Sequence, residues 1–505
     1  MKKNITPRHR FFVFVGSNKF FWAIVLLLIL EAGWIALTGR YPMAFDEDFH
    51  LGLIKIYTHH ISPFWDGQAS GGDAFGAVAR DPSYFYHYIM SFPYRAIEAV
   101  TSNLMAQVLI LRAINITFFV GGLVVYRRLL AKVGASTQIV NLCLLVFVLI
   151  PVTPLLAAQI NYDNVIIPLT GLALLLALAL KQNSTKKHVD VRGLLWLIIV
   201  CLCASIVKYA FLPIFIAIIV FTIVFFKGKY QTIKELRIAL LHGWSKIGKI
   251  VAASMILAIV LLGGLFIERY GVNILRYHKP VPDCAEVLDY DHCQYYGPWI
   301  RDYNFKEQKG NAETSLNNFA FEWIRGMWLR SFFAVDGPAS DFQTRGPLTI
   351  PGWSGIIFGT LGFIALCLKA KTVWRKYNNS ALWLLLGTTL GYLLVLFATN
   401  YSMYIETARP VAINGRYLLP VMPFMILLSA LGVKEITKNY PKLQIGLVCL
   451  IILGFTWGGG ALTYILRSND SWYWHNQHIK VINHAVQNSI GPITPGYRQP
   501  TQFLY

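Results

Sequence analysis

The stretch FDEDFHLGLIKIY, residues Phe45 to Tyr57, follows the first long apolar run of the chain and concentrates three carboxylates and a histidine. If it forms a helix, at about 100° per residue, Asp46, Glu47 and His50 share one face of the first turn. Further along, the same face becomes apolar. The pattern predicts a helix with an acidic tip that lies at a membrane surface.

The composition around this stretch is that of a membrane protein. The 505 residues are 55% hydrophobic and 14% charged, with a mean hydropathy of +0.50, whereas soluble domains carry about 25% charged residues. The formal net charge is +20, but Lys and Arg stand in short clusters between apolar runs and form no basic face interleaved with aromatics. We therefore expect an all-α polytopic membrane protein that contacts the lipid bilayer and no nucleic acid.

Apolar runs with the length of membrane spans recur along the chain. We count about eleven: 20–38, 106–126, 138–157, 165–180, 193–207, 211–226, 247–267, 351–368, 381–398, 418–433 and 443–466. The stretch 193–226 is either one long tilted helix or two short ones hinged where Lys208 and Pro213 interrupt the run. The charge pattern favours two helices.

Basic segments alternate with the other connecting segments, so the positive-inside rule places the basic ones in the cytoplasm. The N-terminus, MKKNITPRHR, is basic and has no cleavage signature, which predicts an uncleaved anchor with a cytoplasmic N-terminus. The loops 39–105 and 268–350 and the C-terminus then face outward, and both loops contain aromatic-rich stretches typical of amphipathic surface helices. We expect a transmembrane domain over 1–466, a short extracytoplasmic tail over 467–505, and a location in the plasma membrane.

Two of the seven cysteines, Cys284 and Cys293, lie in the outward loop 268–350. An oxidising compartment favours a disulfide between them. Two free thiols are one alternative, and a metal site made with the nearby histidines and aspartates is another.

Polar residues are expected at the outer membrane boundary in two places, the loop 39–105 and the segment that follows the third apolar run. Arg80 and Asp81 follow a glycine-rich segment, and an arginine there suits a lipid phosphate; a turn that contacts headgroups is the alternative. Asn161 and Asp163, in the motif INYDN, end the third apolar run. A helix cap is their simpler interpretation.

Further ionisable residues stand out by position. Lys208 is on the outer side, against the positive-inside bias, which favours anion binding or pairing with a carboxylate over snorkelling to the surface. Arg416, beside Tyr417, precedes the tenth run and is another outward cation. Glu31 and Arg112 lie within apolar runs, where they can pair or face a cavity.

Taken in order, these motifs resemble the GT-C superfamily of membrane glycosyltransferases, which includes the protein O-mannosyltransferases and the lipid A aminoarabinose transferases. The resemblance rests on the acidic pair and His after the first span, YFYHY before the second, INYDN after the third, the lysine between the fifth and sixth, and GRYLLPVMPF. It implies a GT-C-like bundle that transfers a sugar from a polyprenyl-phosphate-linked donor to a hydroxyl of a glycan, lipid or protein acceptor, with inversion, on the extracytoplasmic side.

The resemblance also implies roles for individual residues. Asp46 is the general base, and Glu47 orients it, binds the acceptor or helps to hold a divalent ion. His50 hydrogen-bonds the base or ligates a metal, so a divalent metal at Asp46, Glu47 and His50 is possible. The candidates for binding the substrate, of which the first three would meet the donor phosphate, are Arg80, Lys208, Arg416, Asp81, Asn161, Asp163 and Tyr417.

Other functions fit the same pattern. A plain acidic helix N-terminus, stabilised by the helix dipole, explains the acidic stretch without chemistry. A multi-span transporter or flippase for lipid-linked substrates also has many spans and intramembrane charges, although the sequence lacks the paired halves that transporters commonly have. A non-catalytic GT-C-like assembly subunit is the third alternative.

Overall fold

The structure is a computed structural model that describes residues 7–65, 67–310, 312–332, 350–457, 459–468, 472–474, 477–494 and 497. Over these residues the chain is helical and contains no strand; an isolated antiparallel bridge pairs Gly39 with Tyr473. The all-α polytopic architecture expected from the composition is confirmed.

Seven helical segments of the described chain are long and apolar enough to cross a bilayer. They are α2 (Asn18–Thr38), α5 (Leu104–Ala131), α8 (Asp163–Asn183), α10 (Leu212–Lys229) with the preceding 3-10 turn η2 (Tyr209–Phe211), α12 (Lys249–Phe266), α18 (Ile350–Tyr377) and α19 (Ser380–Thr407). α12 continues through a π-helical turn, η3 (Ile267–Gly271), into α13 (Val272–Tyr277). Three shorter apolar helices accompany them: α6 (Thr137–Leu149), α9 (Val191–Val207) and α21 (Pro441–Thr456).

All eleven predicted apolar runs lie in helices, but some of these helices are interrupted. The run 138–157 divides into α6 and α7 (Val152–Ala157) at Pro151. The run 443–466 divides into α21 and α22 (Gly460–Arg467). Proline and glycine favour such breaks, which is why a count of apolar runs exceeds the number of full-length spans.

The stretch 193–226 forms two helices, as the charge pattern favoured. α9 ends at Val207, and Lys208 has an extended backbone with φ of −154° before η2 and α10 begin. Lys208 therefore lies in the break between the two helices, where it lines a cavity described below. The tenth run likewise starts in a 3-10 turn, η4 (Gly415–Leu418), and continues as α20 (Met422–Thr437).

The loops 39–105 and 268–350 both carry short helices, as expected. The first loop contains α3 (Glu47–Thr58), η1 (Asp73–Phe75) and α4 (Phe85–Val100), and the second contains α14 (Cys284–Val287), α15 (Tyr290–Cys293), α16 (Gly297–Gln308) and α17 (Leu316–Phe332). On α4, Tyr86, Met90, Tyr94 and Ile97 recur at helical spacing and are buried. They pack this helix against α3 and α5, whereas Ile89 and Phe92 on its other side are exposed.

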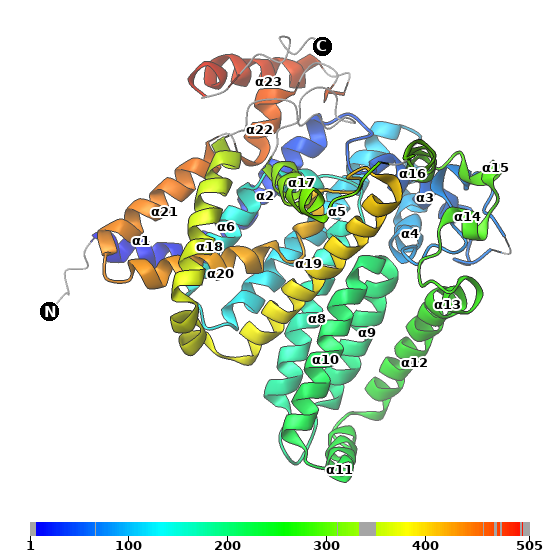
Figure 1. The fold of residues 1–505 in the computed structure, drawn as a ribbon, viewed down its shortest axis with the longest axis horizontal. Helices are drawn as coiled ribbons and strands as arrows, with labels where there is room; N and C mark the ends of the chain where they lie inside the picture. Colours follow the sequence, from blue (N-terminus) through cyan, green and yellow to red (C-terminus); the bar gives the residue numbers. More distant parts are fainter. Residues whose placement is uncertain are drawn as a thin grey trace.

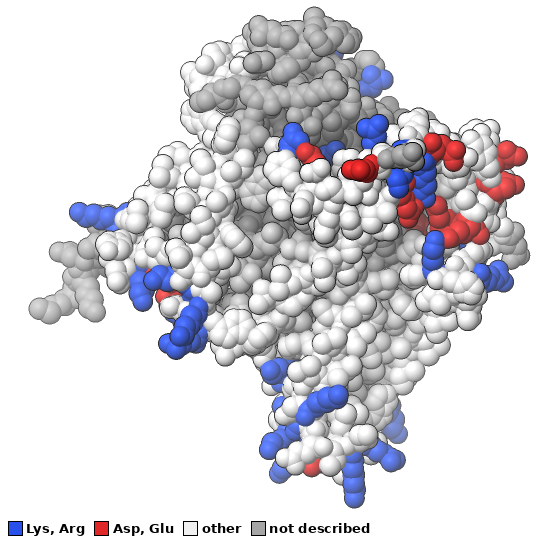
Figure 2. Space-filling model, viewed as in Figure 1, with Lys and Arg blue, Asp and Glu red and all other residues white. Residues whose placement is uncertain are grey.

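Charges divide the molecule into two ends. In Figure 1, α3, α4 and α14–α16 gather at the upper right, whereas α11 (Ile233–Trp244) lies at the bottom. Figure 2 shows Asp and Glu concentrated in the former region, together with several Lys and Arg, whereas the bottom and the left carry mainly Lys and Arg. The exposed cations on or beside α11 are Lys227, Lys234, Arg237, Lys246 and Lys249. This separation matches the alternation of basic loops in the sequence.

Near its C-terminus the chain returns to the C-terminal end of α2. The backbone N–H of Arg40 donates to the carbonyl of Trp472 at 2.7 Å. On α23 (Gln477–Ile490), Asn483 accepts a hydrogen bond from the Trp34 indole at 3.2 Å. These contacts hold the tail beside the segment that leads into α3.

Candidate functional site

The turn before α3 has an unusual backbone. Phe45 and Asp46 have φ values of +72° and +67°, in the left-handed region, which costs non-glycine residues about 1–2 kcal/mol each. The helix therefore begins at Glu47, and the prediction that Asp46, Glu47 and His50 share one helical face is wrong. The surrounding structure holds this turn: the carbonyl of Phe45 accepts hydrogen bonds from Arg416 Nη1 at 2.8 Å and from the side-chain amide of Asn161 at 3.0 Å.

Asp46 forms an ion pair at the surface of this turn. Arg416 Nη2 donates to Asp46 Oδ2 at 2.6 Å. The Asp46 side chain is 58% exposed, whereas that of Arg416 is 8% exposed. The guanidinium also lies 5.0 Å from the ring centre of Phe45 and 5.2 Å from that of Tyr417. A fixed, desolvated cation thus orients a carboxylate that remains open to solvent.

Glu47 has the opposite environment. Its carboxylate accepts two hydrogen bonds from Arg112, at 2.8 and 2.7 Å, and both side chains are fully buried. The backbone N–H groups of Met43 and Ile160 also donate to it, while Arg112 donates to the carbonyls of Ala36 and Gly39. The pair fastens α2, α3, α5 and the turn before α8 together. The pairing of Glu31 with Arg112 considered from the sequence is wrong.

His50 pairs with another histidine. Its Nδ1 lies 2.8 Å from Nε2 of His87 on α4, and both imidazoles are buried. Burial lowers the pKa of His50 well below its ordinary value, and the charges of His87, Arg416 and Lys208 add to this. Burial also lowers the pKa of His87 to about 3. The two rings are therefore neutral, one donating to the other.

The suggested divalent metal at Asp46, Glu47 and His50 does not fit this arrangement. Glu47 is bound by Arg112 and two backbone amides, and His50 is bound by His87. Over the residues that the structure describes, no three His, Cys, Asp or Glu side chains form a group that could hold a metal ion. This also applies to the metal alternative at the histidines and aspartates near Cys284 and Cys293.

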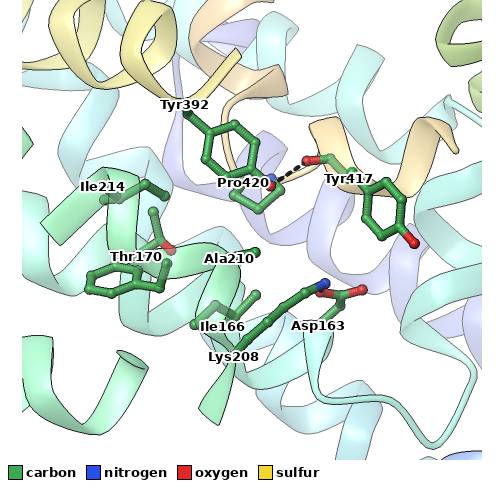
Figure 3. Close-up of a pocket in the computed structure, with 10 residues that line it drawn as sticks. Asp163, Ile166, Thr170, Lys208, Ala210, Ile214, Tyr392, Tyr417 and Pro420 are labelled. Carbon is green, nitrogen blue, oxygen red and sulfur yellow. Dashed lines mark hydrogen bonds and ion pairs between the residues drawn. The ribbon is translucent and has the colours of Figure 1, made fainter. Parts of the chain in front are cut away.

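Lys208 forms a second, buried ion pair close to Arg416. Its amino group binds Asp163 Oδ1, and Asp163 Oδ2 is buried without a hydrogen-bond partner. Figure 3 shows the Lys208 amino group beside the Asp163 carboxylate. The same amino group lies 4.5 Å from the ring centre of Tyr162 and 5.3 Å from that of Tyr417. Tyr417 therefore contacts both cations, and it joins the two ion pairs into one site.

A small cavity opens at this site between α8, α10, α19 and η4. At its polar end are Asp163, Lys208 and Tyr417, and the hydroxyl of Tyr392 donates to the Tyr417 carbonyl at 2.9 Å (Figure 3). The remaining lining residues are mostly apolar: Ile166, Thr170, Ala210, Phe211, Ile214 and Pro420. The cavity therefore has a charged end and an apolar body, but it is smaller than the pockets that hold whole ligands.

Asn161 joins the turn before α8 to the turn before α3. Its side-chain oxygen accepts from the backbone N–H of Asp163 at 2.9 Å, while its amide nitrogen donates to the Phe45 carbonyl. The N-cap of α8 is Tyr162, whose side chain makes no capping hydrogen bond, so the helix-cap interpretation is wrong. Asn115 on α5 supports it and also accepts from the hydroxyl of Tyr86 at 2.9 Å. The INYDN turn thus fixes the position of the turn that carries Asp46.

Arg80 lies in a different cluster. It pairs with Glu268 at the outer end of α12, where Glu268 also lies 3.3 Å from Arg269. Arg80 is therefore bound by a carboxylate, and no contact joins it to Arg416 or Lys208. Asp81 accepts a hydrogen bond from the backbone of Ser83 at 2.9 Å, and burial raises its pKa.

The described structure adds residues that the sequence did not single out. His87 and Tyr162 belong to motifs already noted, YFYHY and INYDN, but their partners are distant in sequence, so periodicity could not identify them. Cys284 and Cys293 form a disulfide with 5.8 Å between their Cα atoms, which is the predicted pairing.

Together the fold and these ion pairs define a polytopic helical membrane protein with a charged site where the turn before α3 meets the helix bundle. The sequence profile of the family described as "Predicted membrane protein (DUF2142)" matches residues 55–425. The chain belongs to this family. No curated protein matches the chain significantly.

Proposed function

We propose that this protein is a membrane glycosyltransferase. It transfers a sugar from a polyprenyl-phosphate-linked donor to an acceptor hydroxyl, with inversion, and Asp46 is the general base. The observation that carries the proposal is the juxtaposition of an exposed Asp46 carboxylate, fixed on a left-handed turn, with two buried cations beside a cavity that is polar at one end and apolar at the other. A carboxylate that can accept the proton of the acceptor and cations that can bind the leaving phosphate thus lie within one site.

The proposed reaction begins at the open side of Asp46. Arg416 binds Oδ2, and Oδ1 accepts the proton of the acceptor hydroxyl as its oxygen attacks the anomeric carbon. A bond forms between that oxygen and the anomeric carbon while the bond from the anomeric carbon to the phosphate oxygen breaks. The electron pair of the broken bond leaves with the lipid phosphate, and attack from the opposite side inverts the configuration.

Arg416 and Lys208 stabilise the charge that develops on the phosphate. Both cations are already desolvated and oriented by Tyr417, so little reorganisation is needed during the reaction. No step requires a metal, in keeping with a set of residues that does not fit one.

The proposal includes an orientation. The basic end, over α11, faces the cytoplasm, and the site faces the extracytoplasmic side of the plasma membrane. The N-terminus is then cytoplasmic and the C-terminus extracytoplasmic. Labelling of single cysteines placed at Lys234 and at Tyr295 with a membrane-impermeant maleimide in intact cells tests it: only the second should react.

A transporter or flippase for lipid-linked substrates is the second candidate. The observation in its favour is the break between α9 and α10, since Lys208 at this break lines the cavity, and discontinuous helices line transporter sites. Arg112, one of the two intramembrane charges that would suit transport, is bound by Glu47 and does not support it.

One assay separates these functions. The full chain is reconstituted in proteoliposomes with radiolabelled polyprenyl-phosphate sugars and a mixture of glycan, lipid and peptide acceptors. Sugar appearing on an acceptor supports the transferase. Movement of the whole lipid across the bilayer without transfer favours the flippase. If the assay shows neither transfer nor movement, the proposal is rejected and a non-catalytic assembly subunit is the remaining candidate.

A further inference from the structure

The helix α11 joins two membrane-spanning helices at the basic end of the molecule. Residues 230–232 separate it from α10, and residues 245–248 separate it from α12. In Figure 1 it lies below the lower ends of both helices. Because the two links are short, α11 stays close to the level at which α10 and α12 leave the bilayer.

The apolar surfaces of α10 and α12 reach almost to α11. Ile223 and Val224 are exposed near the lower end of α10, and Ile250 is exposed at the start of α12. Exposed apolar side chains on membrane-spanning helices face the hydrocarbon of the lipid, which ends where charged residues begin. Lys227 and Lys249 mark that change on the two helices. α11 therefore lies at the boundary between the hydrocarbon and the headgroups.

The buried face of α11 is fixed by a close contact with the segment that precedes α9. Ala239 and Gly243 are the buried residues of the helix. The carbonyl of Ala239 accepts a hydrogen bond from the backbone N–H of Val189 at 3.0 Å. A Cβ at Gly243 would lie 2.1 Å from the carbonyl oxygen of Val189, so glycine alone allows this approach. The contact determines how α11 is rotated about its own axis.

The opposite face of α11 carries apolar and basic side chains together. Its exposed apolar residues are Ile233, Ile238, Leu241 and Trp244, and the exposed cations among them are Lys234 and Arg237. At about 100° per residue, these six positions span about 140° of the helix circumference, on the side away from Ala239 and Gly243. An apolar face with interleaved cations is typical of a helix that lies in a membrane interface.

The charge of this segment is strongly positive. From Lys227 to Lys249 the sequence contains six Lys or Arg residues and one acid, Glu235. Glu235 serves the start of the helix: its backbone N–H donates to the hydroxyl of Thr232, and its carboxylate accepts from the backbone N–H of Gln231 at 2.9 Å. The segment therefore presents an excess of positive charge at the level of the headgroups.

We propose that α11 binds the anionic headgroups of the lipid leaflet at this end of the molecule. Its exposed apolar side chains insert beside the first acyl carbons, while Lys234 and Arg237 bind the headgroup phosphates. Trp244 suits this depth, since tryptophan is enriched at membrane interfaces. An acidic protein partner would account for the cations, but not for the apolar residues between them at the level where α10 and α12 leave the lipid. The inference does not depend on the proposed transfer reaction.

Fluorescence quenching on the full chain in nanodiscs tests this contact. Cys367 and Cys449, which are exposed, are changed to serine, and a polarity-sensitive dye is attached through Leu241→Cys. The nanodiscs contain phosphatidylcholine and phosphatidylglycerol, and a trace of either lipid carries a spin label. Both labelled lipids should quench the dye, and phosphatidylglycerol should quench it more. A dye attached through His242→Cys, an exposed position outside this face, should be more accessible to aqueous iodide.

A charge variant measures the preference for the anionic lipid. Two cations near an anionic surface enrich the anionic lipid by up to roughly thirtyfold. In Lys234→Gln/Arg237→Gln the ratio of the two quenching constants should therefore fall to near unity, and high salt should lower it in the unchanged chain. The matched control, Lys371→Gln/Arg375→Gln, removes two exposed cations near the end of α18 and should leave the ratio unchanged. Equal thermal transitions in detergent show that both variants fold.

Three results would overturn the proposal. Equal quenching by the two labelled lipids in the unchanged chain would show that α11 has no preference for anionic headgroups. Equal quenching by iodide at positions 241 and 242 would show that the apolar face lies in water. A dye at position 241 that neither iodide nor labelled lipid reaches in native membranes would assign this face to a protein partner.

Discussion

Asp46 and Glu47 are adjacent in the chain and carry the same functional group, yet the fold gives them opposite environments. Glu47 is fully buried, with Arg112 and two backbone amides on its oxygens. Asp46 is more than half exposed, and a buried Arg416 holds only one side of its carboxylate. The left-handed backbone at Asp46 keeps this residue out of α3, which begins at Glu47, so the two side chains leave the chain in different directions.

The comparison teaches that an acidic pair can divide its tasks. A buried, fully bonded pair fixes the geometry of the structure but offers no free oxygen, whereas an exposed carboxylate on a fixed backbone can take up a proton. Glu47 is therefore a positioning residue for the turn. The roles that the sequence considered for it, in binding an acceptor or a metal, remain without structural support.

Breaking the buried pair should have the largest effect. Glu47→Gln leaves Arg112 without a counter-charge in the interior, which costs about 3–5 kcal/mol. The variant should unfold at a much lower temperature or fail to accumulate, as measured by the thermal transition in detergent. The double variant Glu47→Gln/Arg112→Met removes both charges and should recover part of the loss. Wild-type stability in Glu47→Gln would contradict the division of tasks.

Asp46→Asn should separate function from stability. Asparagine tolerates the left-handed backbone, its side-chain oxygen can still accept from Arg416, and the exposed side of the pair stays hydrated, so folding should suffer much less than in Glu47→Gln. Sugar transfer should fall by about 10²–10⁴-fold, because general base catalysis is lost. Turnover in proteoliposomes and binding of the lipid donor are measured side by side. A variant that turns over like the wild type removes Asp46 as the base.

Variants of Lys208 test whether the cations of the site bind a phosphate. Lys208→Met alone would leave Asp163 as an uncompensated buried charge, so the informative variant is Lys208→Met/Asp163→Asn. It should bind sugar-free polyprenyl phosphate at least about tenfold more weakly, since a hydrogen bond to a charged group contributes about 1.5–3 kcal/mol. The matched control is Arg80→Met/Glu268→Gln, in the other cluster. Equal losses in both double variants would argue against a phosphate site at Lys208.

The smallest expected effect is the pH dependence of stability that comes from the pair of His50 and His87. Because the pKa values of His50 and His87 are lowered in the folded chain, the unfolded chain binds more protons below its ordinary histidine pKa of 6.5. Their contribution to stability is therefore complete above pH 6.5 and is lost as the pH falls toward about 3.

Thermal transitions recorded between these pH values measure this effect. The double variant His50→Gln/His87→Gln retains hydrogen-bonding groups but has no imidazole to titrate, so its midpoint should depend less on pH than that of the wild type. Parallel pH profiles for the two proteins would show that the histidine pair does not contribute.

Much of the site could be named from the sequence because each residue violated a local rule. Lys208 and Arg416 are cations on the side that the positive-inside rule leaves poor in them, and Asp46 is an acid directly after a span. Their partners could not be named, because pairing depends on contacts between segments far apart in the chain. Arg80 obeys the same local argument as Arg416, yet it lies in a separate cluster with Glu268 and Arg269.

The sequence by itself determined the solvent, the helical class, the approximate positions of the apolar helices and the cysteine pair, because hydropathy, charge and spacing are local properties. Only the tertiary structure decided which acid is buried and which cations converge on Tyr417. These outcomes depend on where helices break and pack: the left-handed turn at Phe45 and Asp46 persists only because Asn161 and Arg416, distant in sequence, bind the same carbonyl.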